Sequence, residues 1–547
     1  MNIEHATIPE NHASIIPEPA KMTFNLGNFV LNDNTSIQSD TELRNISEYL
    51  RNLISPPTGF QLKPNITDTD DILDNAINLV INEEREDLGD EGYCLITTND
   101  YILISAPKPA GVFYGIQTLR QLFPIEIEKR FLISDIEEWV LPGVTIEDYP
   151  RFSWRGFMLD EGRHFLGKAI VKRMLDLLAL HKLNVFHWHL TEDQGWRIEI
   201  KKYPRLAEVG SYRKGTQIGG IRSFLTKEFD STPHGGYYTQ TDIKEILSYA
   251  QERFITIIPE IDMPGHSMAV LAVYPEYSCA GGPFKVQTTF GIKKDVLCPG
   301  KENVFRFLQD VLDELINIFP SKFIHIGGDE VPKSRWKKCP DCQARITTEN
   351  LDSEGDLQTY FINRIASYLL SKGRVPIGWN DILDKNLRLE VIGQHWFRGN
   401  NKVLDHLRKG RKFVISRFFY TYLDYPYTMT PLRKVYSINP IPEKLEKVYH
   451  ENILGIEAPV WSEWISTIDR LDWQVFPRLT ALAETGWILE EKKNYFDFKK
   501  RLERFLQRLE VLGVKNARLN QIDPGFFKRL FLPLTMLRDP QKNVSTY

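Results

Sequence analysis

Eight short apolar runs, each followed by a segment long enough to hold a helix, constrain the fold of this chain more than any other feature. Apolar residues are nearly continuous within each run, as is typical of strands that are buried on both faces. Strands of this kind that alternate with helices predict a closed (β/α)8 barrel. The predicted strands are FMLDEGR (157–163), NVFHWHLT (184–191), ITIIPEID (255–262), KFIHIGGDE (322–330), RVPIGWND (374–381), VIGQHWF (391–397), KFVISRF (412–418) and ILGIEAPVW (453–461).

Helical periodicity supports the segments between these runs. Ile170, Met174, Leu177 and His181 recur at the spacing of one helix face. Further helices are predicted at 242–253, 304–319, 357–371 and 477–487.

The segment that precedes the barrel has a different pattern. Short strands at 94–98 and 101–106 and a helix at 110–123 predict a small α+β domain. The expected organisation is a flexible leader (1–15), the α+β domain (16–140), a (β/α)8 catalytic barrel (150–515) and a C-terminal extension (516–547).

Charge and hydropathy exclude two classes of partner. A formal net charge of -4 gives no electrostatic basis for binding nucleic acid. No stretch is apolar enough to span a bilayer. Residues 1–22 lack the basic and apolar regions of an export signal, so the chain is either cytoplasmic or has lost its signal.

The cysteines give only a weak signal. Cys339 and Cys342 form a CPDC motif, whereas Cys279 and Cys298 stand alone in the sequence. A single CxxC without a second pair is poor evidence for zinc. We therefore expect a disulfide or free thiols here, and no metal or other cofactor in the active site.

Polar residues cluster where the predicted strands end, and the run FIHIGGDE (323–330) is the most informative example. Its two glycines would allow a ligand to approach closely, and Asp329 and Glu330 follow directly. An acid pair is the usual equipment for cleaving a glycosidic bond. Because a barrel gathers the carboxyl ends of its strands at one mouth, the dispersed polar residues should converge there.

The adjacency of the two acids bears on the mechanism. The side chains of adjacent residues on a regular strand point to opposite sides of the strand. Asp329 and Glu330 are therefore poorly placed to act on one glycosidic bond from its two opposing faces. They fit better if one carboxyl protonates the leaving oxygen while the other orients a nucleophile carried by the substrate. Spacing alone leaves these routes open, because glycines can rotate the end of a strand.

Five motifs carry a resemblance to a known family. In order along the chain they are RGFMLDEGRHF (155–165), HWHLTEDQGWRIEI (187–200), PEIDMPGH (259–266), HIGGDE (325–330) and APVWSEW (458–464). They resemble glycoside hydrolase family 20, the β-N-acetylhexosaminidases, over roughly residues 15–515. The resemblance implies an exo-acting retaining hydrolase of terminal 2-acetamido-β-hexosides, with N-acetylglucosamine- or N-acetylgalactosamine-terminated glycans as substrates. It also favours export of the protein.

The resemblance implies a role for each matching residue. Glu330 would be the general acid/base, Asp329 would polarise the acetamido group as it closes into an oxazolinium, and Tyr422 would donate to the acetamido oxygen. Arg163 would grip sugar hydroxyls. The aromatic box would consist of Trp379, Trp396 and Trp461, and the remaining sugar hydroxyls would be bound by Asp424 and Glu463.

One part of the expected site departs from the family pattern. His266 would connect Glu330 to an acid further back, and the matching position is Glu192, where the family pattern has Asp. Either Glu192 or the adjacent Asp193 could complete this relay. The relay would adjust the pKa of Glu330, which must be protonated for the first step of the reaction and ionised for the second.

Two other functions remain as alternatives. The barrel could be a catalytically inactive sugar-binding protein. It could also be a metal-dependent amidohydrolase, because His187 and His189 share one face of a predicted strand.

Overall fold

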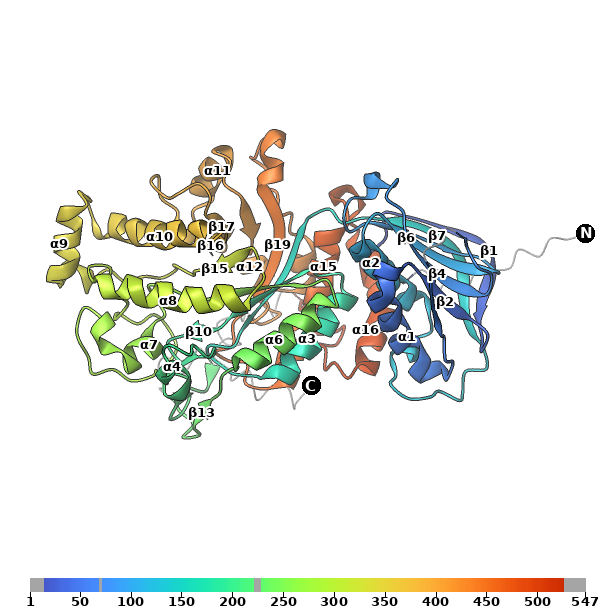
Figure 1. Cartoon of the computed structure of the whole chain (residues 1–547), viewed down its shortest axis with the longest axis horizontal. Coiled ribbons are helices and arrows are strands. Elements are labelled where there is room, and N and C mark those ends of the chain that lie inside the picture. Colours follow the sequence, from blue (N-terminus) through green and yellow to red (C-terminus); the bar gives the residue numbers. More distant parts are fainter. Residues whose placement is uncertain (1–13, 68–70, 221–227, 526–547) are drawn as a thin grey trace, which may run out of the picture.

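The computed structural model describes residues 14–67, 71–220 and 228–525 as two packed units. Figure 1 shows a sheet with its helices at one end of the molecule and a barrel with its helices at the other. The predicted fold class is therefore confirmed. Residues 1–13 of the predicted leader lie outside the described residues. Ile15, the last residue of that predicted leader, is buried. The extension from 516 is described only as far as 525.

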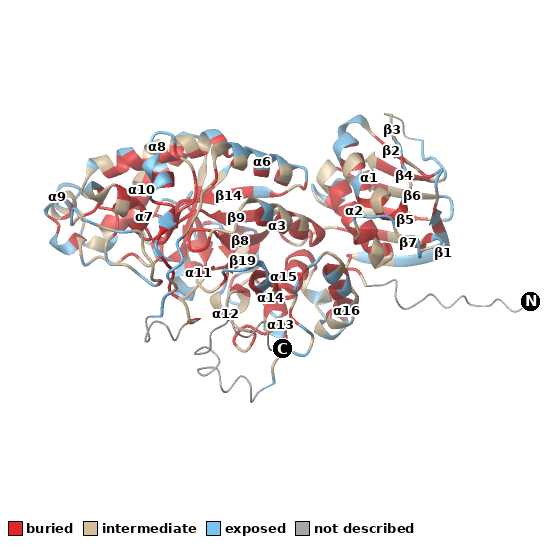
Figure 2. Cartoon of the chain, turned by 90° about the horizontal axis from the view of Figure 1, so that it is seen from below, coloured by how far each residue is buried: buried red, intermediate tan, exposed pale blue. Residues whose placement is uncertain are grey.

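The N-terminal unit is a seven-stranded mixed sheet in the order β1-β7-β5-β6-β4-β2-β3. Two helices, α1 (Arg44–Thr58) and α2 (Pro109–Leu122), cover the sheet face that looks toward the barrel (Figure 2). Strand β7 continues past residue 140, so the sheet leads almost directly into the barrel. The strands are β1 (Lys21–Leu31), β2 (Ser36–Ser39), β3 (Pro64–Ile66), β4 (Ala76–Ile81), β5 (Tyr93–Thr97), β6 (Tyr101–Ala106) and β7 (Trp139–Asp148).

All eight predicted barrel strands form, and they close in the order β14-β15-β16-β17-β18-β19-β8-β9. Each neighbouring pair is parallel, so the carboxyl ends of the strands meet at one mouth. The strands are β8 (Trp154–Asp160), β9 (Val185–His189), β14 (Thr256–Glu260), β15 (Phe323–His325), β16 (Val375–Trp379), β17 (Ile392–His395), β18 (Phe413–Ile415) and β19 (Ile453–Val460).

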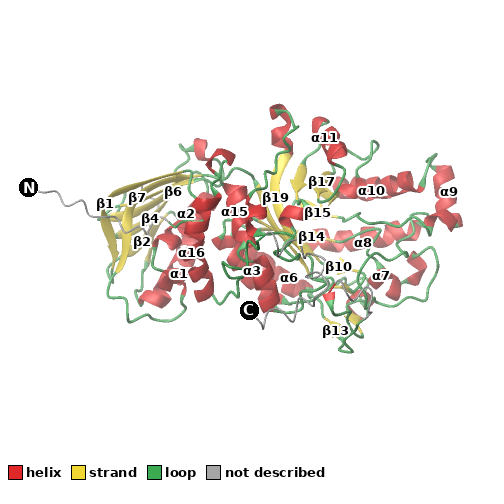
Figure 3. Ribbon diagram, turned by 180° about the vertical axis from the view of Figure 1, so that it is seen from behind, coloured by secondary structure: helices red, strands yellow, loops and turns green. Residues whose placement is uncertain are grey.

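Helices surround the barrel (Figure 3), and local sequence explains where several begin. Thr239 and Asp242 form a capping box at α6, and Ser353 caps α10. Between β16 and β17 the connection holds only the 3-10 turn η8 (Asn380–Ile382). The main helices are α3 (Lys168–Leu180), α6 (Gln240–Gln251), α8 (Glu302–Ile318), α10 (Glu354–Ser371), α11 (Asn400–Arg408), α14 (Ile468–Val475), α15 (Arg478–Trp487) and α16 (Tyr495–Val511).

The loops at the mouth carry short elements of their own. They include the hairpin strands β10 (Thr191–Glu192) and β11 (Gly195–Trp196) and the strands β12 (Tyr212–Arg213) and β13 (His234–Gly235). The short helices are α4 (Arg205–Glu208), α7 (Met268–Val273), α9 (Pro340–Thr348), α12 (Phe418–Thr421) and α13 (Leu432–Tyr436).

Buried ion pairs join the two units. Lys182 Nζ lies 2.8 Å from Asp148 Oδ2 in a fully buried pair, and Arg155 Nη1 lies 2.8 Å from Glu91 Oε2. Removing one partner of such a pair leaves an uncompensated charge, which costs about 3–5 kcal/mol. These contacts therefore hold the N-terminal unit against the barrel. Among the described residues, no helix is both long and apolar enough to cross a membrane.

Candidate active site

The turn after β15 places the acid pair at the barrel mouth. The strand ends at His325, and Gly327 and Gly328 then adopt positive φ angles of 62° and 97°. A Cβ on Gly327 would lie 1.8 Å from Asp262 Oδ1, and one on Gly328 would lie 2.2 Å from Ile382 Cγ2. The glycines are therefore required by close packing against the protein itself as well as by the backbone turn. The sequence suggested only that a ligand could approach closely here, and it did not reveal this packing requirement.

Asp329 and Glu330 lie beyond the regular strand, so side-chain alternation does not separate them. Asp329 Oδ2 and Glu330 Oε2 each lie 3.7 Å from Nε2 of His266. Glu330 and His266 both have positive φ, at 50° and 47°. Non-glycine residues occupy this region at an energetic cost, and such residues concentrate at functional sites. The two carboxylates consequently converge on one imidazole.

Glu192 lies behind His266 and makes the closer contact. The distance from His266 Nδ1 is 2.8 Å to Glu192 Oε1 and 3.8 Å to Asp193 Oδ2. Burial would lower the pKa of His266, but the Glu192 carboxylate and Asp329 raise it well above its usual value. Asp193 instead accepts a hydrogen bond from the backbone of Met268, and burial beside Glu192 raises its pKa to about 7. Glu192 is therefore the acid that most stabilises the protonated form of His266.

The electrostatic environment of Asp329 disfavours its ionised form. Burial and then the Asp262 carboxylate raise the pKa of Asp329 well above its usual value, and the His266 cation only partly offsets them. Asp262 itself accepts the N–H of Gly328 at 3.0 Å, so it supports the turn as well as facing Asp329. A ligand that brought an N–H donor or a positive charge to Asp329 would stabilise its carboxylate.

Arg163 lies at the centre of the acidic side of the site. Its guanidinium is 2.5 Å from Glu192 Oε1, 3.1 Å from Asp160 Oδ2 and 3.5 Å from Glu463 Oε1. It also lies over the ring of Trp461, with 4.9 Å between Cζ and the ring centroid. These contacts fix the orientation of the planar guanidinium group. Its N–H groups can therefore donate to hydroxyl groups in defined directions.

Four predicted aromatic residues form one continuous wall. The centroids of Trp379 and Trp461 are 5.7 Å apart, those of Tyr422 and Trp461 are 6.5 Å apart, and those of Trp396 and Tyr422 are 6.1 Å apart. Trp396 Nε1 donates to Asp381 Oδ2 at 2.7 Å. Apolar ring faces of this kind match a methyl group and the flat face of a pyranose.

Asp424 and Glu463 form a second acidic pair at the mouth. Burial and the neighbouring Glu463 charge raise the pKa of Asp424, and Asp424 Oδ1 is buried with no hydrogen-bond partner. Burial also raises the pKa of Glu463, although Arg163 opposes that effect. Buried oxygen atoms without partners are costly, so these carboxylates are suited to accept hydroxyl donors from a ligand. All eleven predicted site residues thus belong to one connected cluster.

Sequence reasoning missed the base of the site, which is organised by Glu260. Its carboxylate accepts from His189 Nδ1 at 2.5 Å and from Trp379 Nε1 at 2.9 Å. His187 Nε2 lies 3.0 Å away and His325 Nδ1 lies 2.9 Å away. A glutamate inside the apolar run IIPEI is the signal that could have revealed it, because lone buried charges are rare.

The same network bears on the amidohydrolase alternative. His187 Nδ1 donates to Glu457 Oε1 at 2.8 Å, so both of its ring nitrogens face carboxylates. Burial alone would lower the pKa of His187, but the Glu457 and Glu260 carboxylates raise this pKa to about 9. Each ring nitrogen of His187 would have to give up its carboxylate partner before it could bind a metal ion. His187 and His189 therefore act as donors to the carboxylates at the base of the barrel.

Comparisons with known proteins agree with this geometry. The model of the glycosyl hydrolase family 20 catalytic domain matches residues 152–490, and that of the family's domain 2 matches residues 12–149. A β-hexosaminidase of Porphyromonas gingivalis is 39% identical over 514 residues, or 92% of this chain. The chain spans 64% of the length of that relative.

Solved structures give the same result. The family 20 β-N-acetylhexosaminidase of Streptomyces coelicolor superposes with a TM-score of 0.81 at 32% identity, covering 93% of this chain and 98% of its own. A mutant Streptomyces plicatus β-hexosaminidase in complex with its product GlcNAc superposes with a TM-score of 0.80 at 32% identity, covering 93% and 97%.

Proposed function

Because the chain belongs to glycoside hydrolase family 20, we propose that it is an exo-acting β-N-acetylhexosaminidase that retains anomeric configuration through the substrate's own acetamido group. The single observation that carries this proposal is the convergence of Asp329 and Glu330 on His266, at 3.7 Å each. Two carboxylates on one side of a site suit one proton-transfer role and one orienting role. They do not suit attack from opposing faces.

In the first step the acetamido oxygen attacks the anomeric carbon and the glycosidic C–O bond breaks. Glu330 donates its proton to the departing oxygen. Asp329 accepts the acetamido N–H and faces the positive charge that develops on the oxazolinium. Because burial and Asp262 make its carboxylate unfavourable in the empty site, Asp329 gains more from that charge in the transition state than from the neutral substrate.

In the second step water attacks the same anomeric carbon and the oxazolinium reopens to the acetamide. Glu330 takes the proton from this water and returns to its starting form. Two inversions at one carbon give net retention. The His266 imidazole, held by Glu192, lies 3.7 Å from both acids, and its protonated form would stabilise whichever of them is ionised.

Sugar recognition follows from the rest of the cluster. Trp379, Trp396 and Trp461 would enclose the acetamido methyl and the sugar face, with Tyr422 donating to the acetamido oxygen. Arg163, Asp424 and Glu463 would bind the hydroxyls of the terminal residue. Asp424 Oδ1 gains the partner it lacks when a hydroxyl donates to it.

The test uses the purified chain and 4-nitrophenyl 2-acetamido-2-deoxy-β-D-glucopyranoside, with NMR of the first product formed. We expect nitrophenol release and an initial β-anomer of N-acetylglucosamine, and no release by Glu330→Gln. An initial α-anomer, or turnover by Glu330→Gln at the wild-type rate, would overturn the proposal. Comparison with the galactosamine isomer identifies the preferred 4-hydroxyl configuration.

The proposed natural substrates are glycans that end in N-acetylglucosamine or N-acetylgalactosamine. Such glycans are found mainly outside the cytoplasm, so we also propose that the protein acts in the periplasm, at the cell surface or in the medium. Fractionation of the source cells tests this, and activity confined to the cytoplasm would contradict it.

A further inference from the structure

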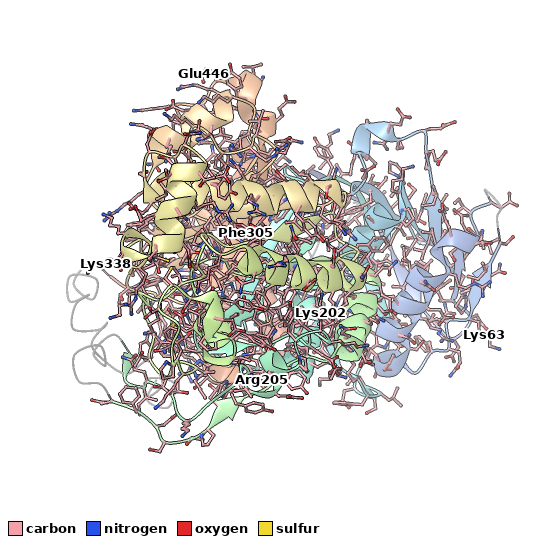
Figure 4. All side chains as sticks on the ribbon, turned by 60° about the vertical axis from the view of Figure 1, so that its left-hand side comes forward. Lys63, Lys202, Arg205, Phe305, Lys338 and Glu446 are labelled. Carbon is pink, nitrogen blue, oxygen red and sulfur yellow. The ribbon has the colours of Figure 1, made fainter. Side chains whose placement is uncertain are left out.

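Four of the five cysteines meet at the end of the barrel remote from the N-terminal sheet. Cys279 follows the turn η6 (Pro275–Tyr277), Cys298 precedes α8, and Cys339 and Cys342 begin α9. Lys338, the residue before Cys339, is labelled on that side of the molecule in Figure 4, opposite Lys63 of the sheet unit. The CPDC motif is thus joined by two cysteines that lie far from it in sequence.

The sulfur atoms are arranged as a compact group. Cys298 Sγ is 3.5 Å from Cys342 Sγ and 3.7 Å from Cys339 Sγ, and Cys279 Sγ is 3.7 Å from Cys342 Sγ. All four lie within 4.8 Å of one another. Four sulfurs at a Zn–S distance of about 2.3 Å in a tetrahedron are separated by about 3.8 Å. The group therefore already has nearly the size of a tetrathiolate zinc site.

A disulfide framework fits this arrangement less well. A disulfide needs an S–S distance of about 2.05 Å between two chosen partners. Here Cys298 lies at similar distances from Cys339 and Cys342, so the geometry selects no pair. Similar distances from one sulfur to two others are what a shared central ion produces.

The backbone around the sulfurs is built for close approach. A Cβ on Gly300 would lie 2.3 Å from the carbonyl carbon of Asp341 and 2.4 Å from the nitrogen of Cys342, so only glycine lets the two loops meet. Lys301 Nζ donates to the carbonyl of Ser278 at 2.8 Å, next to Cys279. Its charge would partly balance the excess negative charge of four thiolates around one divalent ion.

We propose that Cys279, Cys298, Cys339 and Cys342 bind one structural zinc ion. Four protein ligands fill a tetrahedral site and leave no open position for substrate, so the ion would stabilise the fold and take no part in the reaction. This zinc site is independent of the proposed hydrolase activity.

The zinc would join two of the loops that build the mouth. One loop runs from β14 to α8 and carries His266, and the other runs from β15 to α10 and carries Glu330. Between the zinc site and the mouth they are already linked, because Arg335 Nε lies 2.6 Å from Asp295 Oδ1 and Trp336 Nε1 donates to the carbonyl of Leu297 at 3.1 Å. The zinc ion would cross-link these two loops at the ends that lie farther from the barrel mouth.

The first test is the metal content of the full chain purified without chelator and without added reductant. We expect about one zinc per chain by mass spectrometric elemental analysis, a denatured mass that equals the fully reduced polypeptide, and zinc release by a thiol-specific mercurial. Cobalt(II) incorporated in its place should give the visible bands of a tetrahedral thiolate complex. Less than one tenth of a zinc per chain after zinc supplementation, or a mass lower by the hydrogens lost in disulfides, would overturn the proposal.

Variants locate the ion. Cys342→Ser should lose most of the zinc and lower the thermal midpoint by several degrees. Cys94→Ser, a matched control in β5 of the sheet unit, should keep the wild-type zinc content. Full zinc content in Cys342→Ser would contradict the site. Because zinc is measured whether or not hexosaminides are hydrolysed, a failure here is distinguishable from a failure of the proposed activity.

Discussion

Shortening Glu192 by one methylene should weaken the relay without removing its charge. Glu192 Oε1 lies 2.8 Å from His266 Nδ1 and 2.5 Å from Arg163 Nη2. In Glu192→Asp the carboxylate retreats by about one C–C bond length, roughly 1.5 Å, so the distance to His266 grows to about 4.3 Å. At an effective dielectric constant of about 20, their attraction falls from about 6 to about 4 kcal/mol.

A loss of about 2 kcal/mol corresponds to roughly a 30-fold fall in kcat/KM. The assay is kcat/KM for the 4-nitrophenyl glucosaminide across pH. Because Glu192 acts through His266, the alkaline fall in activity should also move to lower pH, as His266 releases its proton earlier. A purely structural defect would lower activity at every pH without shifting the pH at which activity falls on the alkaline side.

Asp193→Asn is the matched control. Asp193 lies 3.8 Å from His266 Nδ1, and burial beside Glu192 raises its pKa to about 7, so it contributes less charge near neutral pH. The asparagine keeps an oxygen that can accept the Met268 N–H. We expect a change within about threefold. Wild-type kcat/KM and an unshifted pH profile in folded Glu192→Asp, or a larger loss in Asp193→Asn, would show that Glu192 does not act through His266.

The other predictions concern the acid pair, an intermediate mimic and a buried histidine. Asp329→Asn should lower kcat for 2-acetamido substrates by about 100- to 1,000-fold, since the charge facing the oxazolinium is lost; steady-state kinetics check this, and a loss below about tenfold would contradict it. A thiazoline mimic of the oxazolinium should inhibit at far lower concentration than N-acetylglucosamine, as transition-state-like ligands do; equal inhibition constants would count against the proposal. Burial lowers the pKa of His181 from 6.5 to about 4, so the folded protein binds fewer protons at this residue than the unfolded protein does. The free energy of unfolding therefore falls by up to about 3 kcal/mol as the pH falls from 6.5 to about 4. Wild-type unfolding midpoints should therefore drop more steeply below pH 6.5 than those of His181→Gln, and parallel curves would show that His181 is not responsible.

The barrel could be predicted because its strands are buried on both faces, which leaves a continuous apolar run in the sequence. Seven of the eight predicted runs contain a whole barrel strand, and the run at 157–163 overlaps only the last four residues of β8, which begins three residues earlier. The polar residues that follow these runs meet at one mouth. Parallel closure makes that convergence a consequence of topology, so Asp329, Arg163 and Glu463 could be grouped before any distance was known.

The parts that could not be predicted depend on contacts between distant loops. Side-chain alternation suggested that Asp329 and Glu330 diverge, but the strand ends at His325 and the positive φ angles that follow redirect both. Glu260 was overlooked because its partners come from three different strands. The meeting of Cys279 and Cys298 with the CPDC motif likewise depends on where long loops lie, which no local pattern encodes.

The central claim is that the substrate's acetamido oxygen is the nucleophile, oriented by Asp329 while Glu330 transfers the proton. The most direct measurement is kcat/KM for a series of aryl glucosaminides whose N-acetyl methyl carries zero to three fluorines. Each fluorine withdraws electrons from the attacking oxygen and barely changes its size. We expect kcat/KM to fall steeply and progressively along the series, whereas a nearly constant kcat/KM would exclude attack by the acetamido oxygen.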